Sequence, residues 1–169
     1  MMKDSTIQVI CGPGKGKTAS ALGRGISALI HGNDIGFALA DALHINYYDV
    51  EILQEVLKRL EPEFKLFRFE KSPVVFDQLS EEEKEEARIN IRNGLNFSKK
   101  VLVTGECDIL ILDEILGILD EGILTLEELC ALIGQARQSE AELIMTGTVY
   151  PAALDEWVDE VTKLQTRFE

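Results

Sequence analysis

The most informative part of this chain is Ile7-Gln8-Val9-Ile10-Cys11-Gly12-Pro13-Gly14-Lys15-Gly16-Lys17-Thr18-Ala19-Ser20, which predicts the class of fold. It opens with a mostly apolar run typical of a buried strand, continues through three glycines and two lysines, and then favours a helix. This order predicts a phosphate-binding loop. Glycines let backbone N–H groups curl around phosphate oxygens, and the helix N-terminus adds a partial positive charge.

The pattern G-x-x-x-x-G-K-[ST] assigns roles within this loop. We expect Lys17 to reach the terminal phosphates and the Thr18 hydroxyl to ligate Mg²⁺. The match is a variant, because Cys11 replaces the first glycine and Pro13 has no N–H to donate. A glycine-rich turn that merely contains lysines is the alternative, and the flanking strand and helix argue against it. The expected nucleotide-binding residues are Gly12, Pro13, Gly14, Lys15, Gly16, Lys17, Thr18 and Ala19, with Lys15 and Lys17 also expected to act in catalysis.

Composition narrows the class of protein. A chain of 169 residues with 46% apolar content predicts one globular domain over residues 1–169. No window reaches the ~18 apolar residues of a membrane span, the N-terminus lacks a signal-peptide core, and three cysteines form no disulfide framework. We therefore expect a cytoplasmic protein. A formal charge of −13 argues against a nucleic-acid partner, whereas positive charge at Lys15 and Lys17 suits a small anion.

A second informative stretch is Cys107-Asp108-Ile109-Leu110-Ile111-Leu112-Asp113-Glu114. Four large aliphatic residues before two carboxylates predict a buried strand that presents acids at the ligand-binding edge of a parallel sheet. Asp113 is expected to hold Mg²⁺, directly or through water, together with Thr18. Glu114 is a further metal candidate that could also orient a water or contact a second substrate. In the alternative reading, both acids simply end a strand.

Strands and helices alternate along the remaining chain. We expect strands near residues 6–10, 35–40, 64–69, 109–112, 142–147 and 159–165, with the 64–69 strand closer to an edge. Helices are expected near residues 18–30, 49–60, 81–103, 126–136 and, after Pro151, 152–158. Capping boxes at Ser80 and Thr125 mark two helix starts. This alternation predicts a three-layer α/β/α sandwich with a mostly parallel sheet, as in phosphate-loop NTPases.

These motifs resemble those of the phosphate-loop ATP:corrinoid adenosyltransferases. Residues 12–18 are similar to the loop G-N-G-K-G-K-T, which in that family also follows a residue other than glycine. Residues 107–115 resemble the segment y-D-l-v-i-L-D-E-l/i, and residues 159–162 resemble part of A-D-l-V-T-E-M. Met145-Thr146-Gly147 lies where the family has l-T-G-R, so that Thr148 replaces the arginine, and Pro13 replaces the asparagine of the loop.

The resemblance implies transfer of the 5′-deoxyadenosyl group of ATP to a Co(I) corrinoid, cob(I)alamin or cob(I)yrinic acid a,c-diamide, with release of triphosphate. Because Co(I) is a strong nucleophile, the protein needs to position C5′ of ATP, exclude water and neutralise the triphosphate. Lys15, Lys17, Thr18 and a Mg²⁺ ion on Asp113 would supply that neutralisation. The resemblance also suggests a homodimer and a flavoprotein reductase as the source of Co(I).

Two other functions remain open from the sequence. A divergent family member could bind ATP, with or without a corrinoid, as a carrier or regulator, which the changes at Pro13 and Thr148 would explain. An unrelated phosphate-loop ATPase or kinase could use Glu114 in hydrolysis. The sequence lacks the arginine-rich lid segment that small kinases close over their phosphates.

Overall fold

A single six-stranded sheet forms the centre of the molecule in the computed structural model, which describes residues 6–40, 55–70 and 76–168. Its strands lie in the order β3-β2-β4-β5-β1-β6, and each neighbouring pair is parallel. This arrangement confirms the parallel sheet, and the edge position of the third strand. The strands are β1 (Ile7–Cys11), β2 (Ile35–Ala40), β3 (Phe64–Glu70), β4 (Ile109–Asp113), β5 (Glu142–Thr146) and β6 (Glu160–Lys163).

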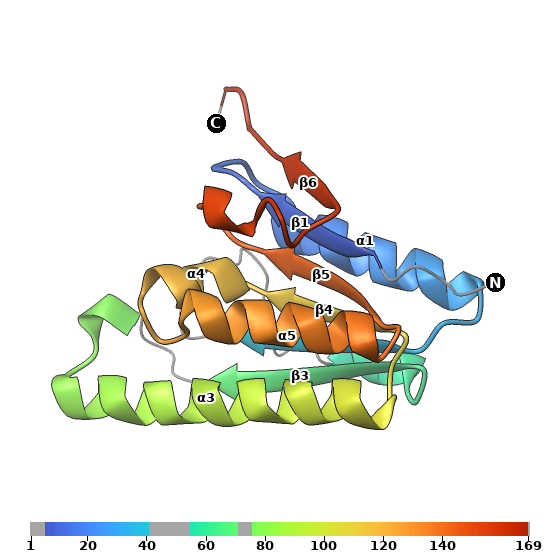
Figure 1. Ribbon diagram of the computed structural model, residues 1–169, viewed down its shortest axis with the longest axis horizontal. Coiled ribbons are helices and arrows are strands. Elements are labelled where there is room, and N and C mark those ends of the chain that lie inside the picture. The colour runs from blue at the N-terminus through green and yellow to red at the C-terminus, as the bar shows by residue number, and fades with distance from the viewer. Residues whose placement is uncertain (1–5, 41–54, 71–75, 169) are drawn as a thin grey trace.

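Helices cover both faces of the sheet and complete the expected three layers. In Figure 1, α1 lies on one face, whereas α3 and α5 lie on the other. The α-helices are α1 (Lys17–Ile30), α3 (Glu81–Thr104), α4 (Ile115–Asp120) and α5 (Leu126–Gln138). Short 3-10 helices lie at η2 (Lys58–Leu60), η3 (Phe76–Gln78) and η4 (Ala152–Leu154).

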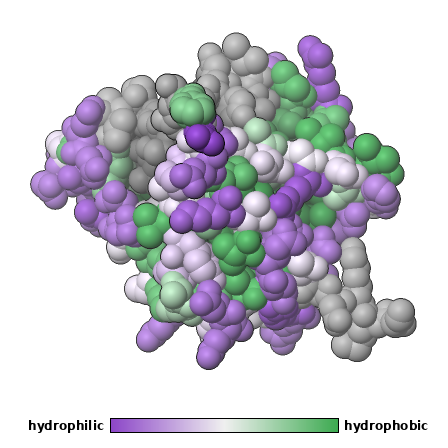
Figure 2. All heavy atoms as spheres, turned by 90° about the horizontal axis from the view of Figure 1, so that it is seen from above, coloured by the Kyte–Doolittle hydropathy of each residue, from purple (hydrophilic) through white to green (hydrophobic). Residues whose placement is uncertain are grey.

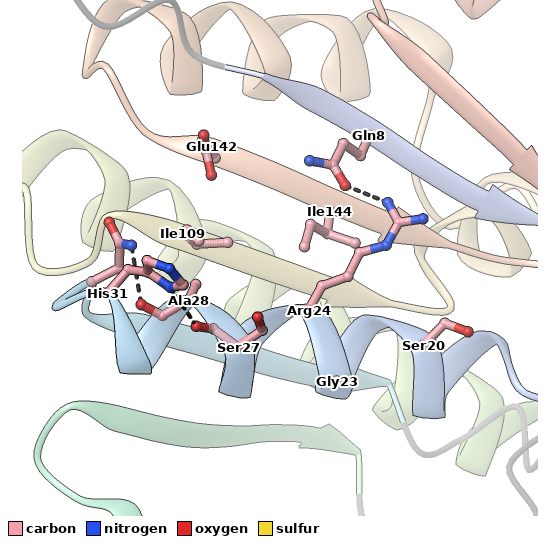
Figure 3. Close-up of a pocket in the computed structure, with 11 residues that line it drawn as sticks. Gln8, Ser20, Gly23, Arg24, Ser27, Ala28, His31, Ile109, Glu142 and Ile144 are labelled. Carbon is pink, nitrogen blue, oxygen red and sulfur yellow. Dashed lines mark hydrogen bonds between the residues drawn. The ribbon is translucent and has the colours of Figure 1, made fainter.

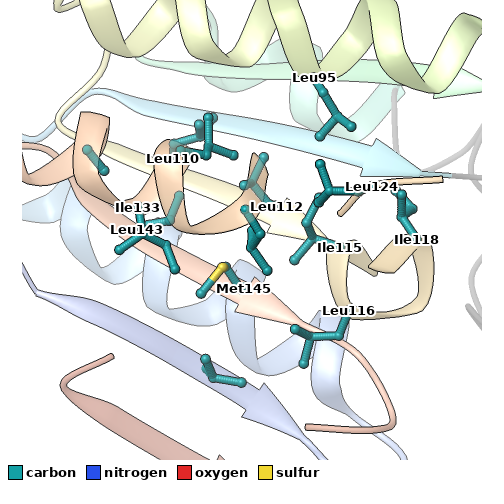
Figure 4. Packing of buried hydrophobic residues seen from close by; sticks show 14 of the residues in the cluster. Leu95, Leu110, Leu112, Ile115, Leu116, Ile118, Leu124, Ile133, Leu143 and Met145 are labelled. Carbon is teal, nitrogen blue, oxygen red and sulfur yellow. The ribbon is translucent and has the colours of Figure 1, made fainter. Parts of the chain in front are cut away.

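The two faces of β4 explain its unbroken apolar sequence. Leu110 and Leu112 pack in the apolar cluster beneath α3 and α5, which Figure 4 shows, while Ile109 and Ile111 pack in the cluster beneath α1. Successive side chains of a strand point to opposite faces, so a strand covered on both sides needs an apolar residue at every position. Asp113 comes directly after this run and is itself buried.

Local signals correctly marked where two helices begin. The Ser80 hydroxyl accepts a hydrogen bond from the Glu83 amide at 3.2 Å, and the Glu83 carboxylate accepts one from the Ser80 amide at 2.9 Å. The Thr125 hydroxyl likewise accepts from the Glu128 amide at 3.1 Å. These contacts satisfy N–H groups that have no partner within the helix.

The spacing of Leu22, Ile26, Leu29 and Ile30 predicts an apolar stripe that packs α1 on the sheet, and this prediction is partly wrong. Ile26 and Ile30 are 42% and 81% exposed, and the helix packs on the sheet through Ala21, Leu22 and Gly25. A Cβ atom on Gly25 would lie only 3.0 Å from the Cδ1 atom of Ile111. Small residues let the helix approach the sheet closely, which turns the larger isoleucines away from it.

Other boundaries also differ from the sequence prediction. Of the predicted 49–60 helix, residues 49–54 lie outside the described residues, and residues 55–57 are helical before η2. The sequence also predicts an apolar stripe at Leu53, Val56, Leu57 and Leu60. Of these, Leu57 is buried, Val56 is 50% exposed, and Leu53 lies outside the described residues. Pro151 precedes η4, a shorter helix than the predicted one. The helix α4 was not anticipated because it is only six residues long.

Candidate functional site

A glycine-rich loop joins the end of β1 to the start of α1, in the order that the sequence predicted. Gly12 has a φ of 106° and Gly16 a φ of 97°, both in the left-handed region that favours glycine. A Cβ atom on Gly16 would meet no atom within 4 Å, so the backbone angle alone calls for glycine there. The loop lies at the C-terminal edge of the parallel sheet, where such folds bind ligands.

Thr18, in the first turn of α1, meets Asp113 at the end of β4. The Thr18 hydroxyl donates to the Asp113 carboxylate, with distances of 2.9 and 3.2 Å to its two oxygens. The two residues are 95 positions apart and are 5% and 1% exposed. The fold thus brings together two of the residues that the sequence singled out as metal ligands.

Thr146 at the end of β5 completes this buried group, and sequence reasoning missed its role. Its hydroxyl donates to Asp113 Oδ1 at 2.9 Å and accepts from the Glu114 amide at 2.8 Å. β5 is the neighbour of β4 in the sheet, so the ends of the two strands lie side by side. The signal in the sequence was a polar residue at the end of an apolar strand. Its contact with Asp113 can be inferred only once β5 is known to lie beside β4.

Glu114 is the most unusual acid of the site. It has a φ of 62°, is 1% exposed, and its Oε2 atom has no hydrogen-bond partner among the described residues. Burial, reinforced by the nearby Asp113 charge, raises the pKa of Glu114 to about 8, although the positive charge of Lys17 lowers it. A buried carboxyl oxygen without a partner is suited to meeting a ligand, a cation or a water.

The donor set fits a magnesium ion. Mg²⁺ prefers oxygen ligands and is usually held by one or two protein groups together with phosphates and water. The Thr18 hydroxyl and the Asp113 carboxylate are adjacent oxygen donors, and the unpartnered Glu114 Oε2 belongs to the next residue. The described residues contain no cluster of three or more acidic, histidine or cysteine side chains that would form an all-protein cage.

The lysines of the loop differ in their surroundings. Lys17 Nζ donates to the Gly14 carbonyl at 2.7 Å, so its ammonium group folds back across the loop. The Lys15 side chain is exposed, as are Pro13 and Ala19, whereas Gly12 and Gly14 are buried. Lys17 is therefore the lysine that the structure holds inside the loop.

A segment from the other end of the chain lies against the loop. The Gly14 amide donates to the Leu164 carbonyl at 2.9 Å, and the Lys15 amide donates to the Thr166 hydroxyl at 2.8 Å. Sequence reasoning assigned these two amides to a phosphate cradle and did not anticipate these partners. No local pattern links residues 12–16 with residues 164–166, because their contact follows from the pairing of β1 with β6.

A separate hollow of about 610 Å³ lies between α1 and the sheet, away from this site (Figure 3). Arg24 projects into it and bonds to the Gln8 side chain, and its guanidinium also pairs with Glu160 at 3.2 Å. The His31 ring, at the far end of α1, contacts the Ser27 carbonyl at 3.0 Å. Arg24 and His31 of this hollow are thus engaged with protein atoms.

The parallel sheet, the glycine loop and the Thr18–Asp113 contact define a phosphate-loop nucleotide-binding fold. The solved structure of a KaiC-like protein, PH0186 from Pyrococcus horikoshii OT3, matches with a TM-score of 0.62 and 17% identity over 98% of this chain and 75% of that one. Flagellar accessory protein FlaH from Methanocaldococcus jannaschii matches with a TM-score of 0.55 and 14% identity over 92% of this chain and 67% of that one. At these identities the likeness establishes the fold alone.

The family described as ATP:corrinoid adenosyltransferase BtuR/CobO/CobP matches residues 3–167, and the chain belongs to it. The chain is therefore a transferase of the class that moves the adenosyl group of ATP to a corrinoid.

No curated protein matches the chain. In the part of the chain that the structure describes, no helix combines the length and apolarity needed to cross a membrane.

Proposed function

We propose that this chain binds Mg²⁺·ATP at the loop of residues 12–19 and transfers the 5′-deoxyadenosyl group to a Co(I) corrinoid, releasing triphosphate. The contact of 2.9 Å between the Thr18 hydroxyl and the Asp113 carboxylate carries this proposal. It joins the helix that follows the loop to the acid of β4, which is the arrangement that a magnesium-bound triphosphate requires.

The residues of the loop would position and neutralise the triphosphate. Lys17 leaves the Gly14 carbonyl and turns its ammonium group toward phosphate oxygens, which are stronger acceptors. Lys15 adds a second cation at the exposed rim, and the backbone at Gly12, Gly16 and Ala19 shapes the loop. Pro13 contributes a fixed backbone angle and no hydrogen bond.

Thr18 and Asp113 would hold the Mg²⁺ ion, with Glu114 binding a water of its coordination shell. When bound, Mg²⁺ supplies charge that stabilises the departing triphosphate. Thr146 keeps the Asp113 carboxylate in position through its hydrogen bond. Because Co(I) of the corrinoid is the nucleophile, the protein's own task is to orient ATP and to keep water away.

The proposal also covers the domain organisation, the location and the partners of the protein. The chain works as a single domain over residues 1–169, since both apolar clusters pack on one sheet. It acts in the cytoplasm as a homodimer and receives its reduced corrinoid from a flavoprotein reductase, as the family resemblance suggests.

An assay with ATP, Mg²⁺ and chemically reduced cobalamin tests this function. We expect light-sensitive adenosylcobalamin and triphosphate in equal amounts. Lys17→Ala should abolish the reaction without unfolding the protein, whereas Lys65→Ala, which changes an exposed lysine on β3, should leave it unchanged. Activity retained in Lys17→Ala would remove Lys17 from the mechanism.

The same assay distinguishes the remaining functions. Binding of ATP and cobalamin without turnover would indicate a carrier or regulator. Release of ADP and orthophosphate would indicate an ATPase, a function that the buried, unpartnered Glu114 beside the loop favours as the second candidate. Either result would overturn the proposed adenosyl transfer.

A further inference from the structure

Lys163 lies at the rim of the phosphate loop. In the parallel pairing of β1 with β6, Lys163 stands opposite Cys11, the last strand residue before the loop. Its Cγ atom is 2.9 Å from the position that a Cβ atom on Gly12 would occupy. Figure 1 shows β6 running beside β1 with the chain end beyond it. The side chain of Lys163 therefore lies beside Cys11 and Gly12, at the beginning of the loop.

Backbone contacts hold this lysine in place. The Leu164 amide donates to the Cys11 carbonyl at 2.8 Å, and the Leu164 carbonyl accepts from the Gly14 amide at 2.9 Å. The Thr166 hydroxyl accepts from the Lys15 amide at 2.8 Å. β6 and the loop thus form one hydrogen-bonded unit, in which the position of Lys163 does not depend on its own side chain.

Among the residues that the structure describes, the charge of Lys163 has no partner. Its side chain is exposed, and in the described parts of the chain no carboxylate pairs with its ammonium group. By contrast, Arg24, which also reaches β6, pairs with Glu160 at 3.2 Å. The positive charges of Lys163 and Lys17 both lower the pKa of Cys11, against the raising effect of burial, so both ammonium groups lie near that residue.

A cation at this place, with no carboxylate partner in the described parts of the chain, matters in an acidic protein. The chain carries a formal charge of −13, which repels a triphosphate, and cations beside the loop offset that repulsion locally. Thr148, whose carbonyl accepts from the Gly12 amide at 3.0 Å, carries no charge on the neighbouring strand end. Lys163 supplies a cation on the other side of β1.

We propose that Lys163 is a further phosphate-binding residue of this enzyme, whose ammonium group binds a phosphate oxygen of ATP and of the released triphosphate. The inference rests on the proposed phosphate site at residues 12–19. β5 lies on one side of β1 and β6 on the other, so Lys163 approaches the loop from the side away from Asp113. The triphosphate is then held from two sides, by Lys163 and by the cation site.

Calorimetric titration of the full chain with Mg²⁺·ATP and with inorganic tripolyphosphate tests this role. Lys163→Ala should weaken the binding of both ligands about tenfold, because a charge-assisted hydrogen bond is lost. Lys163→Glu should weaken it further, and Lys163→Arg should restore binding to within about threefold of the wild type. The matched control is Lys65→Ala, an exposed lysine on the opposite edge strand, which should bind both ligands normally.

Three outcomes would overturn the inference. The first is normal binding by Lys163→Ala and Lys163→Glu while Lys17→Ala fails to bind, which leaves the proposed function intact. The second is normal binding by Lys17→Ala as well, which removes the phosphate site itself. The third is a lower melting temperature of Lys163→Ala with no rescue by Lys163→Arg, which would indicate a structural role.

Discussion

Asp113 and Glu114 are neighbours in sequence but differ in what surrounds their carboxyl groups. Asp113 accepts hydrogen bonds from the Thr18 and Thr146 hydroxyls, so its charge is stabilised where it is buried. Glu114 is equally buried, yet its Oε2 atom has no partner among the described residues. Burial of a carboxyl group without hydrogen bonds to its charged form favours the neutral form. The surroundings therefore favour a protonated Glu114 but stabilise the charge of Asp113.

The raised pKa of Glu114 predicts a pH dependence of stability for the ligand-free protein. Folding raises this pKa from 4.5 to about 8, so between these values the folded state holds a proton that the unfolded state has released. The free energy of unfolding should therefore fall as pH rises from about 5 to about 8. In Glu114→Gln this fall should be smaller, by roughly 2 to 4 kcal/mol.

Urea unfolding at several pH values, without nucleotide or Mg²⁺, measures this difference. Glu127→Gln, at an exposed position of α5, serves as the control and should follow the wild-type profile. Parallel profiles for wild type and Glu114→Gln would show that the Glu114 proton does not distinguish the folded from the unfolded state.

The phosphate loop and the end of β6 act as one structural element. Gly12 and Gly14 are buried against residues 163–165, and a Cβ atom on Gly14 would lie 2.7 Å from the Gln165 amide nitrogen. These glycines therefore serve close packing within the chain, in addition to any approach of phosphate. The glycine pattern of the loop has two causes, of which sequence reasoning recognised one.

Two glycine substitutions separate these causes. Gly14→Ala should destabilise the fold by about 1–3 kcal/mol, because backbone atoms at Gln165 must move. Gly23→Ala, on α1 where a Cβ atom meets nothing within 4 Å, should instead stabilise it by up to about 1 kcal/mol. Chemical denaturation of both variants gives the comparison. Equal stability of Gly14→Ala and wild type would mean that the C-terminal segment does not pack on the loop in solution.

The whole molecule combines an acidic surface with a local group of lysines. Hydrophilic and hydrophobic residues are interspersed on the face shown in Figure 2, and the formal charge is −13. Lys15, Lys17 and Lys163 gather where β1 ends, because the parallel sheet places β6 beside β1. The positive electrostatic potential near the loop therefore depends on the strand order, which places Lys163 close to Lys15 and Lys17.

Nucleotide binding should stabilise the entire fold. At a Mg²⁺·ATP concentration of about 100 times Kd, the expected gain is about 2.7 kcal/mol, and for a chain of this size the melting temperature should rise by about 5–10 °C. Lys17→Ala should show no such rise, while Lys65→Ala should show the full one. A wild-type melting temperature that does not change with Mg²⁺·ATP would contradict nucleotide binding at this site.

The local sequence was sufficient to predict the strand, loop and helix around Lys17, the start of α3 at Ser80 and the buried run that ends in Asp113. Each depends on residues close together in the chain, whose periodicity and hydrogen bonding are visible without the fold. Three features could not be read from the local sequence: Thr146 bonds Asp113, Leu164 and Thr166 bond the loop, and Ile26 faces solvent. These features depend on strand order and on how closely α1 approaches the sheet, and both arise from contacts between residues far apart in sequence.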